Sequence, residues 1–182
     1  MWVGEVLVDF NGIVLFDPSL LMSRYGGSIA TGTDLFTKYT TTEEGDEVLA
    51  AGLIAPILAI DDGGYDIIIR MSQEPSSNPA PVLVTNGIYP LAVRDELVLA
   101  DLVVLKEWIE GVAWQHVEMA PGNYAVMVNG FRQLNSSLNQ IIKAGYEFVF
   151  DPCDTLPPPT ADLAKNMNVL RLDILGPSNQ LQ

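Results

Sequence analysis

GLIAPILAIDDGGYDIIIR, residues Gly52–Arg70, aligns without a gap with GVAWQHVEMAPGNYAVMVN, residues Gly111–Asn129. Each stretch runs from an apolar segment through a glycine-containing turn into a second apolar segment, a pattern typical of paired β-strands. The identical positions are Gly52/Gly111, Gly63/Gly122 and Tyr65/Tyr124. We therefore predict a duplicated β-hairpin unit. Chance similarity between two hairpins of an all-β protein is the alternative.

The turns of the two stretches give specific expectations. Gly63 and Gly122 stand in the turns, where a glycine adopts a positive φ at low cost. Tyr65 and Tyr124 follow the turns at the same spacing, and each precedes an apolar triplet. We therefore expect both glycines to have a positive φ in equivalent turns, and both tyrosines to pack in equivalent positions.

A second similarity extends the duplication toward the N-terminus. Asn11–Phe16 (NGIVLF) resembles Asn86–Leu91 (NGIYPL), but a longer stretch separates the first copy from its following unit. We place the extra residues between Ser23 and Glu47, a stretch rich in Gly, Thr and Ser. A long loop in a compact domain is usually functional or disordered. This insertion is therefore either a binding loop or an ordinary mobile segment.

The length of 182 residues predicts a single domain over 1–182. Within it we expect pseudo-repeat 1 over about 3–75, pseudo-repeat 2 over about 81–132, and a C-terminal extension over 133–182.

The fold class predicted is all-β and mainly antiparallel, in a β-sandwich or barrel-like domain with one or two short helices. The helices are expected at Leu102–Glu110 and Ser137–Ala144, because a glycine that can cap a helix follows each. The strands are expected near Val3–Phe10, Ile13–Phe16, Gly52–Ile60, Tyr65–Met71, Pro81–Val84, Ile88–Val93, Glu96–Leu99, Gly111–Met119, Tyr124–Asn129, Tyr146–Phe150 and Val169–Leu175.

Charge limits the classes of partner. The chain has 23 acidic and 9 basic residues, a net charge of −14. A field of this sign repels nucleic acid and anionic membranes, and it attracts a basic protein. We therefore predict a basic protein partner, no nucleic acid and no membrane. The alternative is that the acidity only keeps the protein in solution.

Two features bear on location. The longest uncharged apolar run, Val48–Ile60, is shorter than the roughly 20 residues of a membrane-spanning helix, and the N-terminus is interpreted as a first strand. Cys153 is the single cysteine, which fits a reducing compartment. We therefore expect a cytoplasmic protein.

The residues that could carry chemistry are few. His116, the one histidine, is expected on the outer face of its strand beside Trp114, opposite Val117 and Met119. Cys153 stands among acidic residues, which raise the pKa of a thiol and disfavour a reactive thiolate. One Cys and one His cannot form a zinc site, and the acidic clusters lack EF-hand spacing. We therefore predict no catalytic residues, no metal and no cofactor.

The function predicted is a non-catalytic, acidic protein-interaction module. Carboxylates in the insertion and in the first turn would contact basic side chains, and nearby aromatic residues would act as anchors. In charge and size the chain is similar to bacterial inhibitor and immunity proteins that neutralise basic toxins and nucleases. The candidate partner-binding residues are Glu43, Glu44, Asp46, Glu47, Asp61, Asp62, Tyr39, Trp114 and His116.

Two alternatives remain. A cleft between the duplicated units would suit a small-ligand or carbohydrate-binding protein, or a hydrolase that uses two carboxylates. Exposed strand edges and an apolar content of 48% also favour a homodimer.

The net charge predicts how stability depends on salt. Folding brings 23 carboxylates closer together, and salt at about 0.15 M screens exposed charges beyond roughly 8 Å. We expect the Tm at about pH 7 to rise with added NaCl, and to be no lower at about pH 6 than at about pH 8. Thermal melts monitored by circular dichroism test this. A Tm that does not change with added NaCl would show that the carboxylates are neutralised by local contacts.

Overall fold

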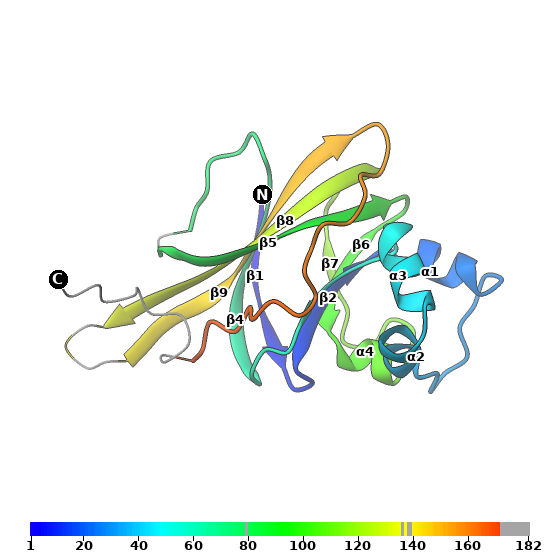
Figure 1. Cartoon of the computed structure of the whole chain (residues 1–182), viewed down its shortest axis with the longest axis horizontal. Coiled ribbons are helices and arrows are strands. Elements are labelled where there is room, and N and C mark those ends of the chain that lie inside the picture. Colours follow the sequence, from blue (N-terminus) through cyan, green and yellow to red (C-terminus); the bar gives the residue numbers. More distant parts are fainter. Residues whose placement is uncertain (79, 136, 138–139, 172–182) are drawn as a thin grey trace.

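The computed structural model describes residues 1–78, 80–135, 137 and 140–171. These residues form two β-sheets packed face to face, with four short helices on the far side of the smaller sheet (Figure 1). The strand order is β1-β4-β9-β8-β5 in the five-stranded sheet and β3-β2-β6-β7 in the four-stranded sheet. Every described pair is antiparallel except β4 with β9. The predicted all-β class is confirmed.

The elements have the following bounds. The strands are β1 (Trp2–Val8), β2 (Gly12–Phe16), β3 (Ile54–Leu58), β4 (Gly63–Met71), β5 (Val82–Val93), β6 (Leu97–Asp101), β7 (Gln115–Val117), β8 (Gly122–Asn135) and β9 (Gln140–Cys153). The helices are α1 (Pro18–Arg24), α2 (Leu35–Thr41), α3 (Glu44–Ala50) and α4 (Val103–Lys106).

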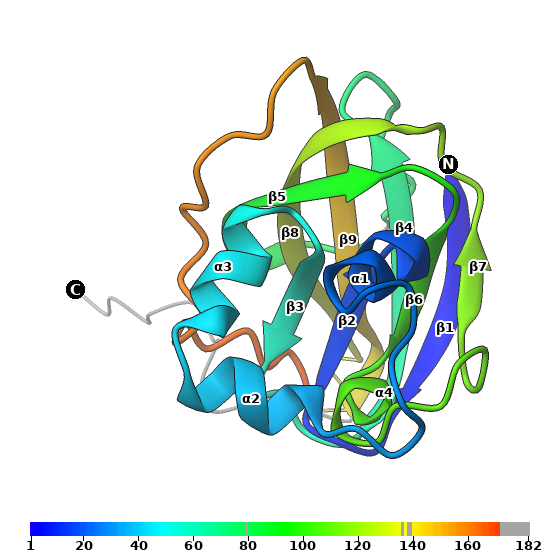
Figure 2. The ribbon, with the colours of Figure 1, turned by 90° about the vertical axis from the view of Figure 1, so that its right-hand side faces the viewer.

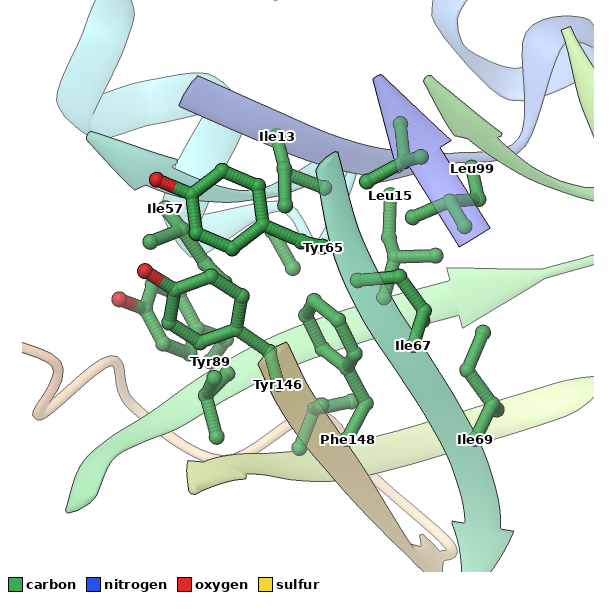
Figure 3. Packing of buried hydrophobic residues seen from close by; sticks show 14 of the residues in the cluster. Ile13, Leu15, Ile57, Tyr65, Ile67, Ile69, Tyr89, Leu99, Tyr146 and Phe148 are labelled. Atoms are coloured by element: carbon green, nitrogen blue, oxygen red, sulfur yellow. The ribbon is translucent and has the colours of Figure 1, made fainter. Parts of the chain in front are cut away.

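The main core lies between the sheets. Ile13 and Leu15 of β2 point toward Ile67 of β4 and toward Tyr146 and Phe148 of β9 (Figure 3). All five side chains are fully buried. Alternate residues of each strand face this core, which is the period-2 pattern of a sandwich.

A second core lies between the four-stranded sheet and the helices. Val14 and Phe16 of β2 and Val98 of β6 pack there against Leu35 of α2 and Val48 of α3. Strands β2 and β6 are therefore buried on both faces. The helices of this layer are visible in front of the sheet in Figure 2.

The predicted insertion between Ser23 and Glu47 belongs to this helical layer. It contains the end of α1, all of α2 and the start of α3. Asp17 caps α1, with Pro18 in the first turn, and Asp34 caps α2 by accepting from Thr37 N. Both are standard signals for helix N-termini.

The strand order repeats along the chain. Strands β1 and β4 pair in one sheet while β2 and β3 pair in the other, and β5 to β8 repeat this arrangement. The turns at Gly63 and Gly122 therefore join strands of facing sheets instead of strands that lie side by side. Strand β2 pairs with β6 where the two units meet. This order supports the duplication, which stays a prediction, as do its boundaries.

The expectations for the turns are met in part. The hydroxyls of Tyr65 and Tyr124 donate to the carbonyls of Asp61 and Ala120, each four residues earlier, at 2.5 and 2.6 Å. Both rings are buried, so the expected equivalence of the tyrosines is confirmed. The expectation for Gly122 is wrong: Gly63 has a φ of 155°, but Gly122 has no positive φ and starts β8 as extended backbone.

Two buried aspartates connect the units reciprocally. Asp17, at the end of β2, accepts from the backbone N–H groups of Arg94 and Asp95 at 2.6 and 2.9 Å. Asp101, at the end of β6, accepts from those of Asp9 and Phe10 at 2.5 and 3.1 Å. Asp17 of the first unit thus holds the β5–β6 turn of the second, and Asp101 of the second unit holds the β1–β2 turn of the first. Burial opposes the charge of Asp17, but these hydrogen bonds prevail and lower its pKa.

These contacts correct the second sequence similarity. Strand β2 corresponds in topology to β6, whereas Asn86–Leu91 lies inside β5 of the other sheet. The similarity of Asn11–Phe16 to Asn86–Leu91 therefore does not mark equivalent positions.

Both predicted helices differ from the structure. Residues Gln140–Ala144 form the start of strand β9, and Gly145 lies inside this strand, where a Cβ would be 1.8 Å from the Asp66 carbonyl of β4. That glycine allows two strands to approach closely and does not cap a helix. Residues 138–139 lie outside the described residues. Helix α4 ends at Lys106, because the Trp108 backbone pairs with the loop at Gly32 and Thr33.

Two predicted strands are also shorter or absent. The strand expected at Gly111–Met119 is reduced to β7, because Gly111 and Ala113 have φ values of 76° and 60°. At Val169–Arg171 no strand forms, since the backbone N–H of Leu170 donates to the side-chain oxygen of Asn168. The rest of that prediction, residues 172–175, lies outside the described residues.

The tyrosine pair gives a test of equivalence. Tyr65→Phe and Tyr124→Phe each remove one hydroxyl-to-carbonyl hydrogen bond and leave the ring in place. We expect each to lower the free energy of unfolding by about 1 kcal/mol. Urea titration of both variants measures this, with an unchanged m-value as the check that both unfold alike. A cost confined to one variant would contradict equivalent roles.

Candidate functional site: an acidic groove at one end of the sandwich

An open groove lies between the turn that joins β5 to β6 and the chain around β7. Asp95 and Glu96 line one side, and His116 and Glu118 line the other. Asp95 and Glu118 are exposed and make no ion pair with any described residue. Glu96 contacts His116, with 2.7 Å between Oε2 and Nδ1. The groove thus presents carboxylates to solvent over a floor that includes Val117.

The fold fixes the position of these side chains. Asp17 holds the backbone N–H groups of Arg94 and Asp95. Strand β7 pairs with β6 so that His116 lies opposite Val98. On the far side, the Tyr124 hydroxyl holds the carbonyl of Ala120, two residues after Glu118. The groove is therefore built from anchored turns.

Arg94 lies beside the groove without neutralising it. Its guanidinium donates to the carbonyls of Val93 and Gly122, both at 2.9 Å, and to the Asn123 side chain at 2.8 Å. These hydrogen bonds go to oxygen atoms of neutral groups, and Arg94 makes no ion pair with the described carboxylates of the groove.

The corresponding place in the first unit contains an arginine of the chain itself. That hollow lies between the β1–β2 turn and the end of β3, and Phe10, Phe36, Asp61 and Arg171 line it. Arg171 donates to both carboxylate oxygens of Asp61, at 3.0 and 2.9 Å. The guanidinium lowers the pKa of Asp61. The two hollows are therefore similar in position. In the described structure an arginine binds the acid of the first unit's hollow, Asp61, but no arginine binds Asp95 or Glu118 of the groove.

Most acids of the predicted insertion hold the helices together. Glu44 of α3 contacts Lys38 at 2.7 Å and Arg24 at 3.3 Å, and it accepts from the Tyr25 hydroxyl at 2.6 Å. These partners, Lys38 first, lower the pKa of Glu44 to about 2. Glu47 contacts Arg24 at 2.5 Å. These two acids are engaged in contacts within the chain.

The other predicted residues are dispersed. Glu43 and Asp46 make no ion pair within the described part of the chain, and Asp62 accepts from Asn11 N at 3.4 Å. The Tyr39 hydroxyl lies 2.8 Å from that of Tyr25, and burial raises the pKa of Tyr39.

Trp114 packs in the helical layer, with its ring centroid 5.5 Å from that of Trp108. His116 lies on the outer face of its strand, with its side chain 63% exposed, while Val117 is buried, as expected. Of the predicted residues, only His116 lines the groove.

Sequence reasoning missed Asp95, Glu96 and Glu118. Their signal was present, because each stands in or beside a turn that follows or precedes a strongly apolar run. These acids stand singly or in one pair, whereas most of the predicted acids come from the cluster at 43–47. The neighbours of an acid in the sequence do not show which basic residue lies beside it in the folded protein.

A small apolar pocket lies under α2 and α3. Its lining includes Phe36, Tyr39, Leu49, Pro56 and Leu163, and its volume is about 60 Å³. Pockets for small molecules usually measure roughly 300–1,000 Å³. This pocket is therefore too small for a metabolite or a sugar.

The outer face of the five-stranded sheet carries a buried carboxylate. Glu147 accepts from Arg70 at 2.9 Å, from Asn129 at 3.1 Å and from Ser76. Burial raises the pKa of Glu147, but these hydrogen bonds outweigh it and leave the pKa lowered. Arg70 also donates to the carbonyl of Glu74. Glu147 and Arg70 of the sheet thus hold Ser76 and Glu74 of the β4–β5 connection in place.

The surroundings of Cys153 disfavour a reactive thiolate. Burial, followed by Asp151 and Asp154, raises the pKa of the Cys153 thiol, in agreement with the sequence argument. None of the described helices is long and apolar enough to cross a membrane.

Comparisons with known proteins give similarity of structure only. No protein-family model and no curated protein matches the chain. ComJ from Bacillus subtilis, described as an inhibitor of the DNA-degrading activity of NucA, is similar at a TM-score of 0.46 and 14% identity, over 84% of this chain and 96% of ComJ. The protein described as crocagin biosynthetic gene J is similar at a TM-score of 0.48 and 13% identity, over 83% and 97%. At these values neither protein assigns a partner or a site residue to this chain.

The ion pairs of α3 give a test with a matched control. Because the folded pKa of Glu44 is about 2, below its ordinary value of about 4.3, its contribution to stability is present above about pH 5 and is lost as the pH falls toward about 2. We expect Glu44→Gln to lower the Tm at neutral pH, and the difference from the wild type to shrink on acidification. Glu43→Gln, one residue earlier, should change the Tm little. Equal effects of the two variants would contradict this assignment.

Proposed function

We propose that this chain is a non-catalytic protein-interaction module that binds a basic protein through the acidic groove. One observation carries the proposal: Asp95 and Glu118 line an open groove without an ion pair in the described structure, whereas Asp61 in the corresponding hollow is bound by Arg171. A groove with uncompensated carboxylates and a partly apolar floor favours a cationic side chain with an apolar stem.

Arginine is the side chain that this groove fits best. A guanidinium forms two parallel hydrogen bonds with a carboxylate, as Arg171 does with Asp61. A partner arginine that enters between Asp95 and Glu118 would meet the same chemistry. The net charge of −14 would also accelerate its encounter with the partner.

An inhibitor or immunity role is the finer form of this proposal. A basic partner that uses its cationic surface to hold an acidic substrate would lose that surface when the groove covers it. The anchored turns favour this role, because a preorganised surface loses little entropy on binding. We place the protein in a reducing compartment such as the cytoplasm, since Cys153 is its single thiol.

The alternative, a ligand cleft between the two units, has less support. The units meet where β2 pairs with β6, and both strands are buried on both faces. Side chains of the two cores fill the space around this junction.

Two double variants with the same change of net charge test the proposal. Asp95→Asn with Glu118→Gln removes the free carboxylates of the groove, and Glu107→Gln with Glu110→Gln removes two exposed ones near α4. We expect the wild type and the α4 variant to retain the same basic protein from a lysate of the source cells at low salt. The groove variant should lose it, and high salt should release it.

Quantitative affinity capture with mass spectrometry is the measurement. Retention of the partner by the groove variant, or equal loss from both variants, would show that the groove is not the binding surface.

A further inference from the structure

Strand β1 forms an edge of the five-stranded sheet, and no described strand pairs with it on its outer side. It pairs with β4 on one side, and it is the last strand of the sheet on the other. Val3, Glu5 and Leu7 point outward, and Val3 and Leu7 are 61% and 66% exposed. An exposed apolar edge strand of this kind is a template for pairing with another chain.

The direction of its backbone groups follows from one contact. Gln115 donates from Nε2 to the carbonyl of Glu5 at 2.8 Å, so this carbonyl points away from β4. In an antiparallel ladder alternate residues point the same way, so the N–H and C=O groups of Val3 and Leu7 also face the open edge. Among the described residues, the Gln115 amide is the one group that bonds to this edge.

The opposite edge of the same sheet is covered by the chain itself. The backbone N–H groups of Thr160 and Ala161 donate to the carbonyl of Ile88 in β5, at 2.9 and 3.2 Å. Lys165 donates from Nζ to the carbonyl of Thr85 at 2.6 Å. Among the described residues, more hydrogen bonds therefore cover the β5 edge than the β1 edge, where Gln115 makes the one contact.

We propose that an extended segment of the basic partner adds to the sheet beside β1. Its main chain would bond to Val3, Glu5 and Leu7 and would replace the Gln115 amide at the Glu5 carbonyl. A basic side chain would lie opposite Glu5, and apolar side chains would flank it opposite Val3 and Leu7. Opposite charges and apolar pairs across neighbouring strands each stabilise such a pairing. This inference rests on the proposed function for the charge of the partner.

The edge and the acidic groove adjoin each other. Trp2, at the start of β1, lines a hollow whose other wall is formed by Glu118, Met119 and Ala120. Glu118, Met119 and Ala120 also line the acidic groove. A segment paired with β1 would therefore continue toward Glu118, so a second basic side chain could enter the groove.

A second copy of this chain fits the edge less well. An antiparallel pairing of β1 with its own copy, centred on Glu5, would place two carboxylates opposite each other. Like charges at directly opposed positions destabilise a strand pair.

Peptide binding to the isotope-labelled full chain tests the inference. The probe is a blocked peptide as long as β1, which has 7 residues, with the sequence Thr-Val-Thr-Lys-Thr-Val-Thr, so that its lysine lies opposite Glu5 and its valines lie opposite Val3 and Leu7. We expect it to slow amide hydrogen exchange at Val3, Glu5 and Leu7 by about tenfold or more. Exchange at Gly4 and Val6, which face β4, should change little.

Three controls isolate the contacts. A peptide N-methylated on the edge that would face β1 should not protect the chain. A peptide with Glu in place of Lys should bind more weakly to the wild type, and Glu5→Lys should reverse that preference. Glu110→Lys, with the same change of charge near α4, should keep the wild-type preference.

The outcomes separate this inference from the proposed function. Unchanged exchange at Val3, Glu5 and Leu7 with the Lys peptide would overturn strand addition. If the groove double variant still loses the basic protein in the capture experiment, the proposed function stands even though strand addition at β1 is overturned. Protection of β1 that rises with protein concentration alone, together with a dimer in sedimentation, would overturn the partner in favour of a second copy.

Discussion

The two buried carboxylates of Asp17 and Asp101 connect the halves of this sandwich. Each stands at the end of a central strand, and each accepts from two backbone N–H groups in the first turn of the other unit. A buried charge without hydrogen bonds costs several kcal/mol, so these carboxylates are stable only while both turns keep their positions. The pairing of β2 with β6, the start of α1 and the position of Asp95 all depend on this reciprocal arrangement.

The few cations of the chain determine where its negative charge is available. Several pair with acids inside the fold: Arg24 and Lys38 with Glu44, Lys106 with Asp34, Arg70 with Glu147, Lys143 with Asp66, and Arg171 with Asp61. These contacts neutralise the acids that hold the helices and the sheet surface together, and the excess of acids over bases leaves other carboxylates without a partner. Asp95 and Glu118 make no ion pair with a described residue and line one open groove together, which is why the groove is the strongest candidate for binding a basic protein.

The sequence predicted the parts of the structure that depend on local pattern. Alternating apolar residues predicted the β class, and the matched tyrosines predicted two equivalent anchors, Tyr65 and Tyr124. The same alternation placed His116 outward and Val117 in the core. Cap signals at Asp17 and Asp34 would also have predicted α1 and α2. The candidate site was predicted poorly, because His116 is its one member that the sequence singled out.

The sequence by itself determined the alternation of strands, the acidity and the single thiol, because each is a property of neighbouring residues or of composition. Only the tertiary structure decided which acids are neutralised and which glycines bend the chain. Glu44 and Glu118 look alike in the sequence, but helix packing brings Lys38 to the first, while the second lines the groove and makes no ion pair with a described residue. Charge pairing acts over a few ångströms between residues far apart in the chain, so it is fixed only when the sheets and helices have packed.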